Sequence, residues 1–177
     1  FEYLVQKYPN VRIIKNSVYE TINNISSVYA ARDVLLEGDC FICEADLFVS
    51  DSSIFLAELD NSCYYGKMVK GHSDDWVFEL GEGGNITRVG KYGDDCYNMT
   101  GIAFFKQKDA KILHEAIEKE YGVPGYEDMF WDDVVNKHID DFSLTVHPVE
   151  HSQIIEIDTV SELEAVRSTL KEQEHRR

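Results

Sequence analysis

Two aspartates that each follow a short apolar run are the residues best suited to chemistry in this sequence. Asp46 comes soon after the run Cys40–Cys43, two residues after Glu44, while Asp158 directly follows the run 154–157. Residues two apart on a strand point to the same face, and open α/β sheets bind ligands beyond the carboxyl ends of their strands. Carboxylate oxygens are hard ligands, so Asp46 and Asp158 together are suited to hold one Mg²⁺ beside substrate phosphates.

Each aspartate also has a purely structural interpretation. Asp46 could begin the turn that follows its strand. Asp158 could cap the helix expected over residues 160–172, because Asp is a favoured N-cap residue. Position alone leaves both interpretations open, so the metal hypothesis depends on the two side chains meeting in space.

The two tryptophans form a second candidate feature, because both have acidic neighbours. Trp76 follows Asp75, and Trp131 lies between Phe130 and Asp132. Indole faces attract a quaternary ammonium group, each good contact contributing about 0.5 to 2 kcal/mol, and nearby carboxylates add longer-range attraction. The alternative is that these side chains belong to the core, as bulky aromatic residues commonly do.

The other reactive residue types form no catalytic pattern. The histidines are scattered, no serine elbow is present, and neither a Walker loop nor a G-x-G-x-x-G sequence occurs. Cys40 and Cys43 form a C-x-x-C, but residues three apart on a strand point to opposite faces. We therefore interpret the cysteines as buried thiols rather than as a zinc or redox site.

The elements that must position these residues follow a mixed α/β order. A strand at 11–14, a helix beginning at Asn23 or Asn24 and the strand Cys40–Cys43 predict a parallel pair joined by a right-handed crossover. Strands at 63–69, 76–80 and 86–89 predict an antiparallel meander, with a hairpin turn at 81–85. The other expected elements are a buried strand at 101–105, helices at 111–121 and 127–138, short strands at 144–146 and 154–157, and a final helix at 160–172 with a capping box at Ser161 and Glu164.

The whole sequence of 177 residues predicts a single α/β domain over residues 1–177. We expect a mixed, mainly parallel central sheet, helices on both of its faces and the antiparallel meander inserted. Lys and Arg number 17 against 33 Asp and Glu, and the net charge of −16 opposes binding to nucleic acid or anionic membranes. Without a long apolar run or a signal-peptide pattern, the sequence predicts a cytoplasmic protein without membrane association.

The order of four motifs resembles that of the bacterial phosphocholine cytidylyltransferases, members of the sugar-nucleotidyltransferase superfamily. The motifs are YETINNISSVY at 19–29, EAD at 44–46, MFWDDVV at 129–135 and IEID at 155–158. The likeness runs over nearly the whole chain. It implies a central sheet of nucleotidyltransferase type and a Mg²⁺-dependent nucleotidyltransferase.

This resemblance also implies roles for the candidate residues. Asp46 and Asp158 match the two metal-binding aspartates of the family, which carry the catalytic Mg²⁺. Asn24 and Ser27 fall where the family lines its nucleotide side. The residues that fall where the family forms an aromatic and acidic pocket for choline are Trp76, Phe130, Trp131 and Asp132.

The implied reaction is transfer of CMP from CTP to phosphocholine, giving CDP-choline and pyrophosphate. One alternative is a cytidylyltransferase for another small phosphorylated or phosphonate amine, such as 2-aminoethylphosphonate. Another is a noncatalytic module derived from such an enzyme. A trimethylammonium group needs several aromatic faces, whereas one carboxylate can hold a primary amine, so the geometry of Trp76 and Trp131 separates the first two.

One part of the family pattern is not found in this sequence. Family members open with a strand and a Gly-rich loop containing an Arg and, further on, a Lys, and these wrap the triphosphate. The sequence shows neither feature, and a net charge of −16 opposes the binding of CTP without such cations. We therefore expect the first βα portion to be missing from these 177 residues and the fragment alone to be inactive.

Overall fold

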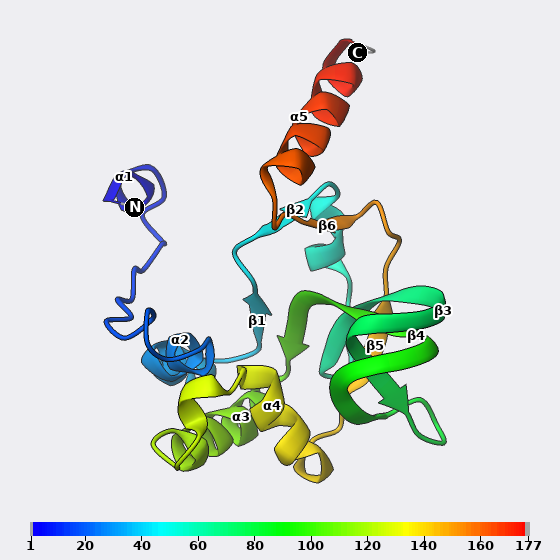
Figure 1. Ribbon diagram of the computed structural model, residues 1–177. Coiled ribbons are helices and arrows are strands. Elements are labelled where there is room, and N and C mark those ends of the chain that lie inside the picture. Colours follow the sequence, from blue (N-terminus) through cyan, green and yellow to red (C-terminus); the bar gives the residue numbers. More distant parts are fainter. Residues whose placement is uncertain (1, 176–177) are drawn as a thin grey trace.

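Two long strands and the turn between them form the centre of the fold. β3 (Cys63–Leu80) and β4 (Ile86–Phe105) pair antiparallel through the predicted turn, where Gly83 and Gly84 have φ values of 92° and 83°. Glycine adopts this left-handed conformation without the steric cost that other residues meet. The structure, a computed structural model, describes residues 2–175 (Figure 1).

The hairpin of β3 and β4 bends strongly, and this bend replaces the predicted three-stranded meander. Val77 pairs with Gly90 on one side and with Asn98 on the other, so the tip of the hairpin folds back onto β4. Register shifts interrupt the pairing, and Gly71 and Asp95 have positive φ values of 79° and 47°. Such bulges increase the local bend of a strand. Two continuous strands therefore form where four short ones, at 63–69, 76–80, 86–89 and 101–105, were predicted.

The central sheet has the order β1-β4-β3-β5 and is mixed, which confirms the α/β class. β1 (Cys40–Cys43) pairs antiparallel with β4, and β5 (Thr145–Pro148) pairs parallel with β3. In the described part of the chain the sheet is therefore mainly antiparallel rather than mainly parallel. The reason is that residues 11–14, expected to pair beside β1, form no strand and leave Val11, Ile13 and Ile14 exposed.

The α-helices that pack on this sheet cover one of its faces, although we expected helices on both faces. Helices α2, α3 and α4 gather on the same side (Figure 1). The opposite face is covered by the short helix η2 and by a two-stranded sheet of β2 and β6. The bounds of these and the remaining elements are α1 Glu2–Lys7, α2 Ile25–Ala31, η1 Arg32–Leu36, β2 Leu47–Val49, η2 Ser52–Leu56, α3 Gln107–Glu120, η3 Tyr126–Asp128, α4 Trp131–Lys137, η4 Ile139–Asp141, β6 Ile154–Glu156 and α5 Val160–His175.

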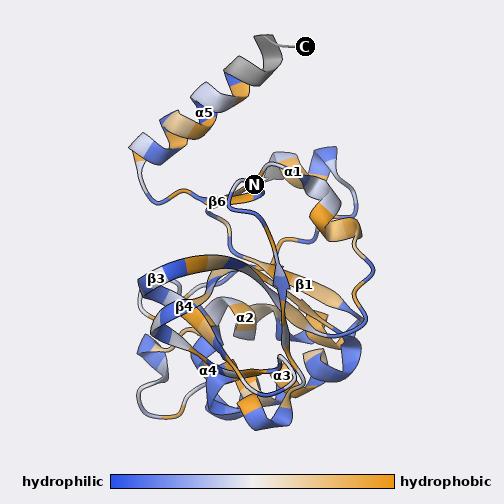
Figure 2. Cartoon of the chain, turned by 90° about the vertical axis from the view of Figure 1, so that its right-hand side faces the viewer, coloured by the Kyte–Doolittle hydropathy of each residue, from blue (hydrophilic) through white to orange (hydrophobic). Residues whose placement is uncertain are grey.

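The last residues of β4 are apolar on both faces of the sheet. Ala103 and Phe105 pack under the helices, while Ile102 and Phe104 pack on the side of η2 and β6. This alternation explains the continuously apolar run predicted at 101–105, because a strand buried on both faces has no polar side. Figure 2 shows hydrophobic residues concentrated on the strands, with hydrophilic residues on the outer loops.

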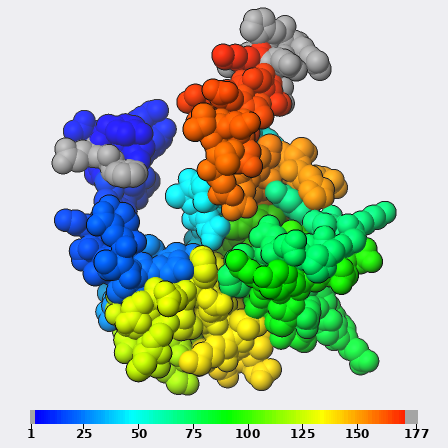
Figure 3. Space-filling model, in the orientation of Figure 1, coloured from blue at the N-terminus to red at the C-terminus, as the bar shows by residue number. Residues whose placement is uncertain are grey.

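The terminal helices lie away from the central sheet. α5 extends from the body of the protein, and open space separates it from the N-terminal residues (Figure 3). The expected capping box of α5 is shifted: Thr159 and Glu162 exchange the hydrogen bonds predicted for Ser161 and Glu164. Within residues 2–175, no helix combines the length and the apolar character needed to cross a bilayer.

A buried glutamate joins α3 to the end of α4. Glu120, at the end of α3, is 4% exposed and accepts hydrogen bonds from Lys137 and, at 2.8 Å, from His138 Nε2. Burial opposes ionisation of Glu120, but the hydrogen bonds from Lys137 and His138 outweigh it and hold the pKa of the carboxyl below its ordinary value. The charged form is therefore favoured by the fold.

We expect Glu120→Gln to lower the free energy of unfolding at pH 7 by about 1–3 kcal/mol, the scale of a hydrogen bond to a charged group. The stabilisation by Glu120 is present above the ordinary glutamate pKa and is lost as the pH falls through its lowered value, so the difference from wild type shrinks in acid. Urea denaturation at several pH values measures both effects. Glu115→Gln, exposed on the same helix, is the matched control, and an equal loss in both variants contradicts the assignment.

Candidate functional site

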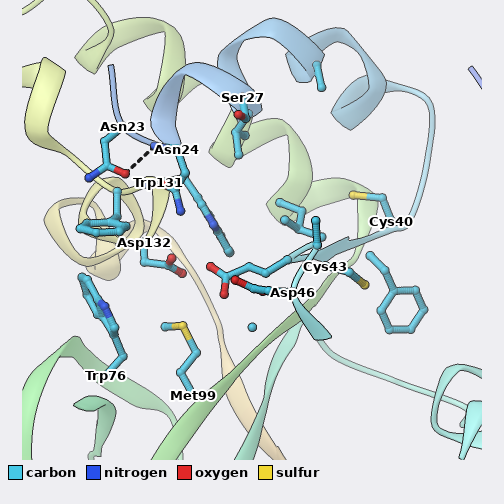
Figure 4. Close-up of a pocket in the computed structure, with 18 of the residues that line it drawn as sticks. Asn23, Asn24, Ser27, Cys40, Cys43, Asp46, Trp76, Met99, Trp131 and Asp132 are labelled. Atoms are coloured by element: carbon cyan, nitrogen blue, oxygen red, sulfur yellow. Dashed lines mark hydrogen bonds between the residues drawn. The ribbon is translucent and has the colours of Figure 1, made fainter. Parts of the chain in front are cut away.

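A cavity of about 790 Å³ opens between α2, β1 and the start of α4. In Figure 4, Trp76, Met99 and Asp132 lie to one side of it, Cys40 and Cys43 to the other, and Asp46 between them. Of the described residues that line the cavity, five are Asp or Glu and none is Lys or Arg. The five acidic residues are Glu44, Asp46, Asp75, Asp132 and Glu156. The cavity therefore favours cationic groups.

Asn24 and Ser27, predicted on the nucleotide side, both line this cavity from α2. Asn24 occupies the N-cap position of α2 but does not cap it through its side chain. Its Oδ1 instead accepts a hydrogen bond at 2.9 Å from the backbone N–H of Trp131, which is the first residue of α4. Asn24 therefore ties α2 to α4 across the top of the cavity. The Ser27 hydroxyl is exposed and accepts a hydrogen bond from Asn16 at 3.1 Å.

The two predicted tryptophans line the same cavity but in different ways. Trp76 is half-buried and meets Phe130 edge-on, with ring centroids 5.4 Å apart, while Lys91 Nζ lies 5.9 Å from its ring centroid. Trp131 is only 3% exposed and stacks on Tyr64 at 5.8 Å with an interplanar angle of 11°. Because Tyr64 covers one face of Trp131, the cavity does not offer two freely open indole faces.

Asp132, predicted to add negative charge to the aromatic pocket, is 2% exposed. Its Oδ1 accepts a hydrogen bond at 3.0 Å from the hydroxyl of Tyr64, which is fully buried. Burial is the main reason that the pKa of the Asp132 carboxyl lies well above its ordinary value. Burial therefore favours the neutral form, in which Asp132 lines the cavity as a polar group rather than as an anion.

The two predicted metal aspartates meet beside the cavity, which Asp46 lines and Asp158 does not. Carboxylate oxygens of Asp46, Glu156 and Asp158 all lie within 4.8 Å of one another, and all three residues are exposed. β2 and β6 bring them together: Leu47 pairs with Glu156, and the backbone N–H of Ile157 donates to Asp46 O at 2.8 Å. The strand ends thus converge as the metal hypothesis requires.

Glu156 was not among the predicted site residues, although the sequence contains its signal. It lies two residues before Asp158, the same spacing that put Glu44 and Asp46 on one face. Loss of water around the carboxyl, followed by the negative charge of Asp158 and other nearby acids, raises the pKa of Glu156 to about 7. Three hard oxygen donors that repel one another are a suitable set for a divalent cation.

The structural interpretation of Asp158 as a helix cap does not describe the fold. Thr159 Oγ1 accepts from the backbone N–H of Glu162 at 3.2 Å, which is the capping bond of α5. The Asp158 backbone N–H donates to Glu162 Oε2 at 2.9 Å. Among residues 2–175, no amide of α5 donates to the Asp158 carboxylate, which stays directed to the acidic cluster.

The proteins that are similar in sequence to this chain are cytidylyltransferases. A scan against models of protein families found no match. The chain is 50% identical over 165 residues to a 2-aminoethylphosphonate cytidylyltransferase from Lancefieldella rimae, covering 93% of this chain and 67% of the relative. It is 25% identical over 171 residues to a choline-phosphate cytidylyltransferase from Streptococcus pneumoniae, covering 97% of this chain and 73% of the relative.

Solved structures share the fold. The CTP:phosphocholine cytidylyltransferase from Streptococcus pneumoniae superposes with a TM-score of 0.82 at 23% identity, covering 96% of this chain and 73% of that one. An inositol-1-phosphate CTP transferase from T. maritima superposes with a TM-score of 0.64 at 14% identity, covering 91% and 66%. The sheet and helices described above therefore form the fold of nucleotidyltransferases.

We expect Mg²⁺ at about ten times its Kd to raise the melting temperature of the protein by about 3–6 °C at constant ionic strength, because a cation that binds only the folded state stabilises it. Asp158→Asn should lose at least half of this shift. Asp60→Asn, an exposed acid outside the cluster, should keep it. Differential scanning calorimetry measures the shifts, and an unchanged Mg²⁺ response in Asp158→Asn contradicts the cluster as the metal site.

Proposed function

Because this chain belongs to the cytidylyltransferase family of nucleotidyltransferases, we propose that it transfers CMP from CTP to 2-aminoethylphosphonate. The observation that carries the proposal is the 50% identity to a 2-aminoethylphosphonate cytidylyltransferase, against 25% to a choline-phosphate cytidylyltransferase. The acidic lining of the cavity supports the same choice. A primary ammonium donates hydrogen bonds to carboxylates, which trimethylammonium cannot do.

The proposed step is an in-line displacement at phosphorus. An ionised phosphonate oxygen attacks the α-phosphorus of CTP, a new P–O bond forms, and the bond to the bridging oxygen breaks. Pyrophosphate leaves with the electron pair. The attacking oxygen carries no proton, so the step needs no general base. The protein must align the two substrates and offset their crowded negative charge.

Different residues of the cavity and of the neighbouring cluster are proposed to bind Mg²⁺ and to contact the nucleotide. Asp46, Glu156 and Asp158 would hold Mg²⁺, since their exposed oxygens converge within 4.8 Å. When bound, Mg²⁺ supplies charge neutralisation at the phosphate groups. Asn24 and Ser27, on the α2 wall, are the proposed contacts of the nucleotide.

Phosphocholine is the second candidate substrate, and one observation favours it. Trp76, Phe130 and Trp131 line a common cavity, which is a requirement for an aromatic cage. The cage is incomplete, however, because Tyr64 covers one face of Trp131 and Lys91 faces the ring of Trp76. Cation–π attraction depends on an open ring face, so these walls favour trimethylammonium less than the sequence predicts.

We expect the protein that also carries the N-terminal βα portion, with CTP and Mg²⁺, to use 2-aminoethylphosphonate with a kcat/KM at least about tenfold above that for phosphocholine, a difference of about 1.4 kcal/mol in transition-state binding. Pyrophosphate release measures both rates. A preference for phosphocholine would overturn the substrate assignment and keep the family chemistry. Absence of turnover and of CTP binding by calorimetry would instead favour a noncatalytic module.

We expect Asp46→Asn to lower kcat by about a hundredfold or more, the scale lost when one group that stabilises transition-state charge is removed. Circular dichroism should be unchanged, because Asp46 is exposed and its backbone bond to Ile157 does not involve the side chain. Asp60→Asn again serves as the matched variant. A near-normal rate in Asp46→Asn removes the proposed metal ligand from the mechanism.

A further inference from the structure

We propose that Glu44 binds the ammonium group of the substrate and selects a primary amine over a trimethylated one. This inference rests on the proposed function, because it assigns one end of 2-aminoethylphosphonate to one side chain. Glu44 lies in the cavity wall two residues before Asp46, where β1 ends. Glu44 belongs to the EAD motif at 44–46, but the proposed metal cluster does not include it.

The length of the substrate limits where its ammonium can lie. Only two methylene groups separate the amine from the phosphonate, so an ammonium site must adjoin the place where the phosphonate reacts. With the phosphonate beside Asp46, Glu44 is the nearest acid along the chain that lines the cavity. Glu44 directly follows β1 and Asp46 lies in the turn that leads to β2, so two neighbouring acids of the cavity wall are available to opposite ends of one small molecule.

The backbone of β4 makes room for the Glu44 carboxylate. The Glu44 backbone N–H donates to Gly101 O at 2.9 Å, so the two residues lie side by side. Gly101 has a φ of 76°, and a Cβ atom built on it would lie 2.8 Å from Glu44 Oε2. Glycine at 101 therefore leaves open the space that the Glu44 carboxylate occupies.

Glu44 also has unused hydrogen-bonding capacity. Within residues 2–175, its carboxylate accepts no hydrogen bond and forms no ion pair, although the residue is half-buried. A half-buried carboxylate without a donor loses part of its hydration without compensation. A primary ammonium brings three N–H donors and would supply that compensation.

The other acids that line the cavity are already engaged. Asp132 is buried and accepts a hydrogen bond from Tyr64, and Asp75 Oδ1 accepts from the backbone N–H of Trp76 at 2.7 Å. Asp46 and Glu156 belong to the proposed metal cluster. Among the acids that line the cavity, Glu44 is therefore the one outside the proposed metal cluster whose carboxylate accepts no hydrogen bond within residues 2–175.

Selection against trimethylammonium follows from the same carboxylate. A quaternary nitrogen has no N–H, so it would bury part of Glu44 without donating a hydrogen bond to it. The incomplete aromatic walls offer little to offset that loss. An analogue without the ammonium group, such as ethylphosphonate, leaves Glu44 equally unpaired.

The test compares the binding of 2-aminoethylphosphonate and ethylphosphonate by calorimetry, with Mg²⁺ and a non-hydrolysable CTP analogue present. We expect the wild type to bind the amine about tenfold to a hundredfold more tightly, the range for one hydrogen bond between charged groups. In Glu44→Gln this ratio should fall to about threefold or less. Glu44→Asp, which keeps the charge, should retain an intermediate ratio, and Glu82→Gln, in the β3–β4 turn, should match the wild type.

The outcomes separate this inference from the proposed function. If the wild type prefers the amine and Glu44→Gln keeps the full ratio, the role of Glu44 is overturned while the substrate assignment stands. If the wild type binds both phosphonates equally, or neither of them, both proposals fail. Thermal melting of each variant verifies that a lost ratio does not arise from unfolding.

Discussion

The convergence of negative charge at one sheet edge is the constraint on which the site depends. Asp46 and Glu156 lie far apart in the sequence, and the antiparallel pairing of β2 with β6 holds their strand ends together. Carboxylates at this distance repel one another, so the backbone bonds and the buried side chain of Ile154 must offset that repulsion. A divalent cation would remove the repulsion, which makes the cluster a site that is completed by its ligand.

The same cavity keeps its carboxylates in three different states. The Asp46 cluster is open to water and suited to a metal, Asp132 is buried and accepts a hydrogen bond from Tyr64, and Glu44 is half-buried without a hydrogen-bond donor within residues 2–175. Environment alone separates these roles, because all are carboxylates of similar intrinsic pKa. A substrate with an anionic phosphonate at one end and an ammonium at the other matches this arrangement.

The hydrogen bond from Trp131 to Asn24 links the fold to the aromatic wall. It holds the start of α4 against α2, where the indole of Trp131 stacks on Tyr64. The Trp131 indole, which the sequence predicted as part of a choline pocket, is therefore packed in the core on one face. The 50% identity to a 2-aminoethylphosphonate enzyme is consistent with a cavity in which carboxylates, rather than aromatic faces, define the amine site.

Local patterns in the sequence predicted most of the helices and strands. They also identified Asp46 and Asp158 as candidate metal ligands. The apolar run of β1, the glycine turn between β3 and β4, and the helix α3 all follow from spacing within a few residues. Only the tertiary structure decided that residues 11–14 form no strand and that Glu156 joins the cluster. Strand pairing and loss of water depend on residues distant in the chain, and no local spacing encodes which of them will meet.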